Sequence, residues 1–444
     1  MRDHPVVIVG AGISGLAAAY ELTRRGRRVR VLEASPRAGG LIHTEHDNGF
    51  VIEDGPDSVL AAKPAALALI DELGLTPRLQ RVREGARAFV LKGRTLHALP
   101  RPSLLGIPLT ADALASYDLL SDEGRARMAL EPTIARRDAT GDESVGSFFR
   151  RRFGPEAVDL IAQPLLGGIH AGDVDRLSMQ SLFPRLLDAE RAHGSVLPRT
   201  AASTTGDASG GFASLHGGMG TLVAALEAAL PAGTIEYGSP VRSFATVASS
   251  CIVVAAPATT AARLVEPLDA GAAALCAQVP YVSTVSVALA WPRARVSHPL
   301  DGTGFVVARR HSDVRITACT WVSSKWEARA PGDSVLLRAF VGGAHDPDAV
   351  DLTDAELVAI VRRDLEAVLG IADEPSLRRV YRWRDAGAQH VVGHLDNVAE
   401  IERRLAPHGV FVTGSGFRAS GIPDCVADGR RVAAEVDGYL DANG

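Results

Sequence analysis

Cysteine is scarce in this chain and follows no recognisable pattern. Only four of the 444 residues are cysteines, and they lie far apart, at Cys251, Cys276, Cys319 and Cys425. A disulfide framework needs several pairs, and structural zinc sites use cysteines about two to four residues apart. The sequence therefore predicts neither disulfides nor a bound metal, and it favours a reducing compartment.

A large excess of charge and long apolar runs are also absent. The formal net charge is −5, so no basic field indicates a nucleic-acid partner. No apolar stretch approaches the roughly 18 residues of a membrane span. Residues 1–5 lead directly into an apolar strand, which leaves no room for a targeting peptide, and we expect a cytoplasmic protein. An amphipathic, arginine-bearing helical stretch within 103–180 leaves peripheral membrane contact open.

The first forty residues carry the clearest pattern. A buried strand at 6–9 runs into Gly10-x-Gly12-x-x-Gly15 and a helix, and a second strand ends on Glu33. In such a turn the first glycine permits the bend, the second lets backbone approach a pyrophosphate, and the third lets helix and strand pack closely. A carboxylate at the end of the second strand accepts hydrogen bonds from a ribose. The spacing predicts a dinucleotide site, and Glu33 argues against NADP.

The residues that follow distinguish a flavin from a nicotinamide. The segment Glu33-Ala34-x-x-Arg37-x-Gly39-Gly40 resembles the signature of the glutathione-reductase-like flavoproteins, a superfamily that includes amine oxidases, desaturases and protoporphyrinogen oxidases. The paired glycines let the chain pass close to a diphosphate, and the arginine can pair with it. This resemblance implies FAD.

Two further stretches resemble the protoporphyrinogen/coproporphyrinogen oxidases. Residues 53–58 match their E-x-G-P-[DN]-S turn, which passes beside the flavin ring. Residues 167–179 match a glycine-rich segment that lines their tetrapyrrole pocket, with the candidates Gly168, His170, Gly172 and Arg176. The resemblance also places Lys63 near a substrate propionate, and a solvated surface lysine is the alternative. His170 stands where the family often has tyrosine, so no catalytic base is assigned.

The C-terminal stretch 409–425 is the second strong signal. A buried strand runs into a glycine-rich turn and a long helix, and the order resembles the C-terminal FAD motif of the same oxidases, G-I-x-D-C included. The helix N-terminus can place backbone N–H groups against the flavin. Cys425 invites comparison with amine oxidases that bind flavin covalently, but we expect a buried, unreactive cysteine.

Five motif blocks in the right order identify the chain as a member of the oxygen-dependent protoporphyrinogen/coproporphyrinogen III oxidase family. Membership implies an α/β fold: a discontinuous Rossmann-type FAD-binding domain, a mixed-sheet substrate domain and a helical subdomain. The expected boundaries are 1–63, 210–265 and 396–444 for the FAD domain, 64–94, 181–209 and 266–395 for the substrate domain, and 95–180 for the helical subdomain. The small-residue run 200–211 predicts a surface loop between units.

The family's reaction removes six electrons from a porphyrinogen in three flavin cycles, each of which passes electrons to dioxygen and gives hydrogen peroxide. The implied partners are the porphyrinogen, dioxygen and a haem-pathway chelatase. The residues expected to bind non-covalent FAD are Gly10, Gly12, Ile13, Ser14, Gly15, Glu33, Ala34, Arg37, Gly39, Gly40, Gly55, Pro56, Asp57, Ser58, Val241, Gly414, Ser415, Gly421, Ile422 and Pro423.

The chain departs from the family pattern at several positions. Leu41 and His43 stand where basic residues are common, Ala388 and His390 replace a proline and a tyrosine, and the link 244–251 is short. These departures keep two alternatives open. One is a flavin amine oxidase or desaturase acting on another apolar substrate, and the other is a non-catalytic FAD-binding scaffold.

The choice between two porphyrinogens depends on carboxylates. Coproporphyrinogen carries propionates where protoporphyrinogen carries vinyls, and each buried carboxylate needs a cation or water. The chain offers Lys63, Arg176, Lys325 and Arg338 in segments that resemble pocket or substrate-domain segments. We therefore expect coproporphyrinogen III as the substrate, with protoporphyrinogen IX also accepted.

The glycine turn predicts how the flavin is held. The purified protein should be yellow and should release its flavin on acid precipitation, whereas flavin that stays with the pellet would contradict non-covalent binding. The substitution Gly12→Val should abolish flavin retention, because the side chain would occupy the space of the diphosphate. The measurement is flavin absorbance per protein after gel filtration.

Overall fold

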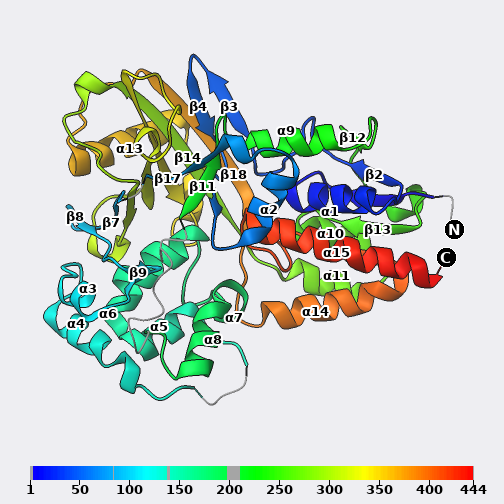
Figure 1. Cartoon of the computed structure of the whole chain (residues 1–444), viewed down its shortest axis with the longest axis horizontal. Coiled ribbons are helices and arrows are strands. Elements are labelled where there is room, and N and C mark those ends of the chain that lie inside the picture. The colour runs from blue at the N-terminus through cyan, green and yellow to red at the C-terminus, as the bar shows by residue number, and fades with distance from the viewer. Residues whose placement is uncertain (1–3, 84, 138–140, 198–210, 444) are drawn as a thin grey trace.

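The structure is a computed structural model that describes residues 4–83, 85–137, 141–197 and 211–443. The predicted surface loop at 200–211 lies outside these ranges except for its last residue. Figure 1 shows three regions: a sheet wrapped by long helices on the right, a second sheet at the upper left, and a group of short helices at the lower left.

The N-terminal strand lies in the middle of a parallel five-stranded sheet with the order β12-β2-β1-β13-β19. Val6 and Ile8 face one apolar cluster, and Val7 and Val9 face another. A parallel strand that is buried on both faces has a continuously apolar sequence, and residues 6–9 have such a sequence. The strands are β1 (Val6–Val9), β2 (Val29–Leu32), β12 (Ile235–Glu236), β13 (Cys251–Val254) and β19 (Val410–Val412).

Helices cover both faces of this sheet, as the predicted Rossmann-type arrangement requires. On the face of Val6 and Ile8 lie α1 (Ile13–Arg24), α2 (Pro64–Glu72), α9 (Gly220–Ala229) and α15 (Ile422–Asn443). On the other face lie α10 (Ala258–Val265), α11 (Ala270–Ala277) and α14 (His394–Leu405). The helices α1 and α15 touch, because a Cβ at Gly429 would lie only 2.3 Å from the carbonyl oxygen of Ser14.

The second sheet has seven strands in the order β18-β14-β17-β16-β15-β7-β8. Its pairs are antiparallel except for the parallel pair β15–β7, so the predicted mixed sheet is confirmed. The helix α13 (Asp354–Leu369) packs on it and begins with a capping box made by Thr353 and Glu356. The strands are β7 (Ala88–Lys92), β8 (Thr95–Ala98), β14 (Tyr281–Pro292), β15 (Gly304–Val307), β16 (Ala318–Trp321), β17 (Ser334–Gly342) and β18 (Leu377–Ala388).

Small sheets connect these regions. The strand β11 pairs with both β5 and β6, and the hairpin β3–β4 extends from the first glycine loops towards the second sheet. These strands are β3 (Thr44–Asp47), β4 (Phe50–Glu53), β5 (Val59–Leu60), β6 (Leu79–Arg81), β9 (Ser103–Leu104), β10 (Ile107–Pro108) and β11 (Phe212–Leu215).

The third region is a helical cluster with its own apolar core. Its helices are α3 (Ala111–Ala115), α4 (Asp122–Ala129), α5 (Val145–Phe153), α6 (Pro155–Ala157), a π-helix (Val158–Gly167), α7 (Met179–Leu182) and α8 (Pro184–His193). In the part of the chain that the structure describes, no helix has the length and apolar character needed to cross a bilayer.

A fully buried ion pair lies inside the helical cluster. Arg152 Nε donates to Glu131 Oε1 over 2.7 Å, and neither side chain is exposed. Glu131 also accepts from the backbone N–H of Val196 at 3.0 Å. Removing one partner of such a pair leaves an uncompensated charge in a low-dielectric interior.

The substitution Arg152→Ala should therefore lower the free energy of unfolding by about 3–5 kcal/mol, measured by urea unfolding. Arg150→Ala is the matched control on the same helix, because Arg150 pairs with Asp175 in a half-exposed position. Surface pairs are worth at most about 1 kcal/mol. Equal effects of the two substitutions would contradict the conclusion that the buried pair of Arg152 and Glu131 stabilises the helical cluster.

Candidate functional site

The turn between β1 and α1 is closed by glycines that bring backbone segments together. At Gly10, φ is +106°, and a Cβ would lie 2.7 Å from the carbonyl oxygen of Ala255. A Cβ at Gly15 would lie 2.1 Å from the carbonyl oxygen of Gly10. At Gly12 no atom lies within 4 Å of the Cβ position. The turn thus leaves open space directly at the N-terminus of α1, where backbone N–H groups favour an anion.

A second glycine loop packs against the first. The Gly39 amide donates to the carbonyl of Ala11 over 2.8 Å, and the Cβ position of Gly40 lies 3.2 Å from the Cα of Gly12. The Arg37 guanidinium donates to three carbonyls of its own loop, those of Ala38, Gly40 and Ile42. It therefore shapes the loop beside the opening, and its pairing with a diphosphate stays a prediction.

Glu33 follows β2 and is fixed beside the turn between β1 and α1. Its Oε2 accepts from the Ala11 amide at 2.7 Å, and its Oε1 accepts from the Ser35 amide at 2.8 Å. The Glu33 carbonyl accepts from the Ser239 amide, which brings the segment containing Val241 alongside. Each carboxylate oxygen keeps a lone pair for a further donor, as binding of a ribose diol requires.

The C-terminal glycine turn packs beside the start of α1. Asp428 accepts from the Thr413 hydroxyl at 2.7 Å and from the Gly414 amide at 3.2 Å, and the Cβ position of Gly414 lies 3.7 Å from Ser14 Oγ. A Cβ at Gly421 would meet no atom within 4 Å. The remaining predicted cofactor residues lie in or beside these loops, at Ile13, Ala34, Ser415, Ile422 and Pro423.

These loops fit a dinucleotide. Open positions at Gly12 and Gly421 adjoin the first turns of α1 and α15, and the Glu33 carboxylate keeps lone pairs that suit ribose hydroxyls. Cys425 is buried, and burial raises its pKa to about 12. A thiol held protonated in this way is a poor nucleophile, which supports non-covalent binding.

The turn after β4 packs on the glycine loops. A Cβ at Gly55 would lie 1.8 Å from the carbonyl oxygen of Leu41, so only glycine fits this contact. Arg338, from β17, donates to the carbonyls of Glu53 at 2.7 Å and of Gly55 at 2.8 Å. The backbone of this turn, which includes Pro56, is thus held by the second sheet.

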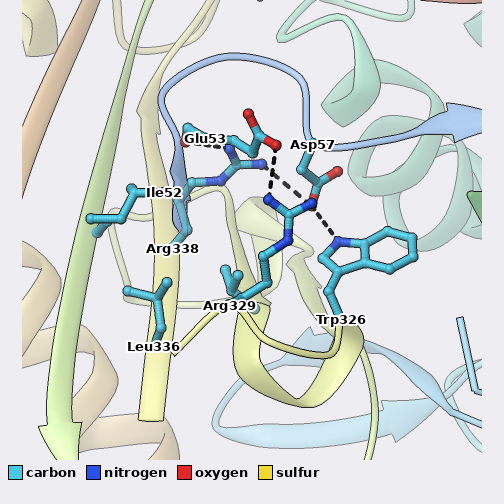
Figure 2. Close-up of a pocket in the computed structure, with 9 residues that line it drawn as sticks. Ile52, Glu53, Asp57, Trp326, Arg329, Leu336 and Arg338 are labelled. Carbon is cyan, nitrogen blue, oxygen red and sulfur yellow. Dashed lines mark hydrogen bonds and ion pairs between the residues drawn. The ribbon is translucent and has the colours of Figure 1, made fainter. Parts of the chain in front are cut away.

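Asp57, in the same turn, is the centre of a buried ion network (Figure 2). Its carboxylate lies 3.1 Å from Lys325 Nζ and 3.6 Å from an Arg338 nitrogen, and accepts from Trp326 Nε1 at 3.3 Å and Ser58 Oγ at 2.6 Å. Burial alone would raise the pKa of Asp57, but the charges of Lys325 and Arg338 hold it well below its usual range. The carboxylate is ionised at neutral pH.

This network corrects one expectation. Lys325 and Arg338 were expected to offer cations to substrate carboxylates, but their side chains are only 11% and 5% exposed and are paired with Asp57. A second buried carboxylate, Glu53, pairs with Arg329 at 2.9 Å. These cations compensate the protein's own carboxylates and are not free to bind a substrate.

The loop that follows the π-helix is held by two glutamines. Gln163, within the π-helix, donates to the carbonyl of Gly172 at 2.9 Å, and Gln389 donates to the carbonyl of His170 at 2.9 Å. A Cβ at Gly172 would lie 2.4 Å from Gln389 Oε1. π-Helical turns are rare and frequent at functional sites, which fits a loop that is shaped for a ligand.

The same loop presents an open apolar face. Ile169 is 63% exposed, and no atom lies within 4 Å of the Cβ position of Gly168. Arg176 is exposed, and its carbonyl accepts from the Val392 amide. Of the four expected substrate cations, Lys63 and Arg176 therefore remain accessible.

His170 lies between this loop and the C-terminal turn. Its Nδ1 is 3.5 Å from Ser420 Oγ. Burial and, to a lesser degree, the nearby charge of Lys63 lower the pKa of His170 to about 4. The imidazole is neutral at physiological pH and is not a strong base.

Two further histidines, His390 and His394, contact the C-terminal turn. His390 Nε2 lies 2.9 Å from the carbonyl oxygen of Ser415, and His394 Nε2 lies 2.5 Å from that of Phe417. The two rings stack with centroids 4.0 Å apart. Burial and the neighbouring His394 lower the pKa of His390 to about 3, so this pair is neutral and donates to the carbonyls.

Lys63 is the N-cap of α2, and its ammonium lies 2.6 Å from Asp424 in the first turn of α15. The two side chains are 35% and 29% exposed, so the pair is in contact with solvent.

Sequence reasoning missed several of these contacts. Asp424 lies in the G-I-x-D-C motif and could have been considered as a partner for a nearby cation. No motif pointed to the other contacts. Gln389 reaches His170 from a distant part of the chain, whereas Gln163 contacts Gly172 and His390 stacks on His394 within one segment each.

Comparisons with known proteins agree with this geometry. The family described as flavin containing amine oxidoreductase matches residues 13–437. The chain is 36% identical to a coproporphyrinogen III oxidase from Bacillus subtilis, over 98% of both chains. It is 26% identical to protoporphyrinogen oxidase 2 from Arabidopsis thaliana, over 98% of this chain and 94% of that one.

A solved structure from Exiguobacterium, assigned as a protoporphyrinogen oxidase, superposes with a TM-score of 0.87 at 30% identity and covers 99% of this chain and 100% of its own. The chain therefore belongs to the flavin-containing amine oxidoreductase family, among its coproporphyrinogen III and protoporphyrinogen oxidases.

Proposed function

We propose that the chain is an FAD-dependent oxidase that converts coproporphyrinogen III to coproporphyrin III with dioxygen, releasing hydrogen peroxide. Protoporphyrinogen IX is a secondary substrate. The relatives named coproporphyrinogen III oxidase, which align over nearly the whole chain, support the reaction.

One observation carries the proposal: the expected cofactor and substrate segments meet on the same stretch of chain, 415–424. His390 contacts the carbonyl of Ser415, His170 approaches Ser420, and Lys63 pairs with Asp424. This stretch directly follows Gly414 and leads into α15, so a molecule on the 168–172 loop would lie next to the dinucleotide opening. Such contact is what hydride transfer from a substrate to a flavin requires.

The bound flavin supplies the electron acceptor, and the protein supplies position and electrostatics. The backbone of the 53–57 turn is fixed by Arg338, and the 168–172 loop is fixed by Gln163 and Gln389. His170 is neutral and partly buried, which keeps charge away from the apolar face of the loop. Lys63 and Arg176 are the accessible cations that would bind substrate carboxylates.

The boundaries expected for the FAD domain, 1–63, 210–265 and 396–444, remain part of this proposal. All five strands of the parallel sheet lie inside these ranges, which supports them, whereas α2 and α11, which also cover the sheet, lie just outside them. We also propose a cytoplasmic location with peripheral membrane contact. A metal-free porphyrin product needs a metal chelatase next, so such an enzyme is the proposed partner.

The proposal predicts porphyrin formation in air. The protein should convert coproporphyrinogen III to coproporphyrin III faster than autoxidation does, as measured by the rise of porphyrin fluorescence. Its kcat/KM for coproporphyrinogen III should exceed that for protoporphyrinogen IX at equal oxygen and salt. The Gly12→Val protein is the flavin-free control. A clear preference for protoporphyrinogen IX would overturn the substrate assignment, and no turnover of either would overturn the function.

The substitution Lys63→Ala should raise KM several-fold and change kcat little, because a contact made equally in ground and transition states affects binding alone. Lys92→Ala is the matched control, since Lys92, at the end of β7, donates to the carbonyl of Leu119 and contacts none of the proposed substrate residues. An unchanged KM for Lys63→Ala would show that Lys63 is a solvated surface charge that does not bind the substrate.

A further inference from the structure

The pair formed by Lys63 and Asp424 is accessible and can exchange partners. The ammonium and the carboxylate lie 2.6 Å apart, and roughly a third of each side chain is exposed. An exposed ion pair is weak, because solvent screens it. A carboxylate delivered by a ligand can therefore take the place of Asp424 on Lys63 at little cost.

A second cation lies beside this pair. Arg185, in the first turn of α8, is exposed and donates through one nitrogen to the carbonyl of Ala62 at 3.1 Å, directly next to Lys63 in the chain. Within the described ranges, no carboxylate lies within ion-pair distance of Arg185. By contrast, Arg191 on the same helix lies 3.5 Å from Asp188. A guanidinium has five N–H donors, so Arg185 keeps most of its donors free.

The surroundings of the two cations suit a flat, largely apolar molecule with acidic arms. The charge of Lys63 acts on His170, and the ring of Phe183 packs edge-on against His170 with centroids 5.8 Å apart. Ile169 next to it is 63% exposed. Apolar surface and two cations therefore lie together at one end of the 168–172 loop.

We infer that Lys63 and Arg185 form a two-cation site that binds the two carboxylates present on coproporphyrinogen III at the positions where protoporphyrinogen IX carries vinyls, and that Asp424 occupies Lys63 when no substrate is bound. The inference rests on the proposed function and adds Arg185 and Asp424 to it. Arg185 is a specificity residue, because at these positions coproporphyrinogen III offers carboxylates and protoporphyrinogen IX offers only uncharged vinyls.

The test uses the FAD-loaded enzyme and measures KM and kcat for coproporphyrinogen III and protoporphyrinogen IX. Arg185→Ala should raise KM for coproporphyrinogen III by about tenfold, as loss of a charge-assisted hydrogen bond implies, with kcat nearly unchanged. KM for protoporphyrinogen IX should change much less. Arg185→Lys should restore part of the loss, and Arg191→Ala should leave both substrates unaffected.

Asp424→Asn should act in the opposite direction. It frees Lys63 from competition, so coproporphyrin III titrated into the protein should bind several-fold more tightly, as followed by quenching of its fluorescence. Flavin content per protein is measured in parallel. Weaker binding by Asp424→Asn at full flavin content would overturn the role of Asp424, and an unchanged KM in Arg185→Ala would overturn the two-cation site.

These outcomes differ from failure of the proposed function. Wild-type enzyme that oxidises coproporphyrinogen III, with the same KM in Arg185→Ala, contradicts the two-cation site alone. Wild-type protein that binds coproporphyrin III in an Arg185-dependent way without oxidising the porphyrinogen contradicts the proposed function alone.

Discussion

Two buried carboxylates hold the junction between the two large sheets. Glu53 and Asp57 lie in and after β4, and their cations come from the other side of the junction: Arg329, Lys325 and, on β17, Arg338. Burying a carboxylate costs several kcal/mol unless a cation and hydrogen bonds compensate it. The turn between the two carboxylates is therefore fixed relative to the second sheet, and removal of any one cation leaves a buried charge.

The glycine loops depend on this turn. Gly55 packs on the carbonyl of Leu41, and the loop containing Gly39 and Gly40 packs on the first turn around Gly12. A Cβ would lie 1.8 Å from the Leu41 oxygen at Gly55, and 3.2 Å from the Cα of Gly12 at Gly40. A chain of backbone contacts thus runs from the second sheet to the N-terminus of α1. In this way the electrostatic network fixes the position of the glycine turns.

The sequence predicted what is local and missed what is long-range. A strand, a glycine turn, a helix and an acidic strand end follow one another within forty residues, so the first motif could be read directly. The positions of Lys325 and Arg338 could not, because their partner Asp57 is more than 250 residues away in the chain. A basic residue in a pocket-like segment looks the same whether it binds a substrate or a buried carboxylate. His390 and His394 are close in the sequence, but the carbonyls that they contact, those of Ser415 and Phe417, belong to the distant C-terminal turn.

We propose that electrons pass from the porphyrinogen to a flavin bound at the glycine turns. The most direct measurement mixes the purified, flavin-loaded protein with coproporphyrinogen III in the absence of oxygen and follows the flavin's visible absorbance. We expect the flavin absorbance to be bleached as porphyrin forms and to return when oxygen is admitted. Flavin absorbance that stays unchanged while the porphyrinogen is present would contradict this proposal.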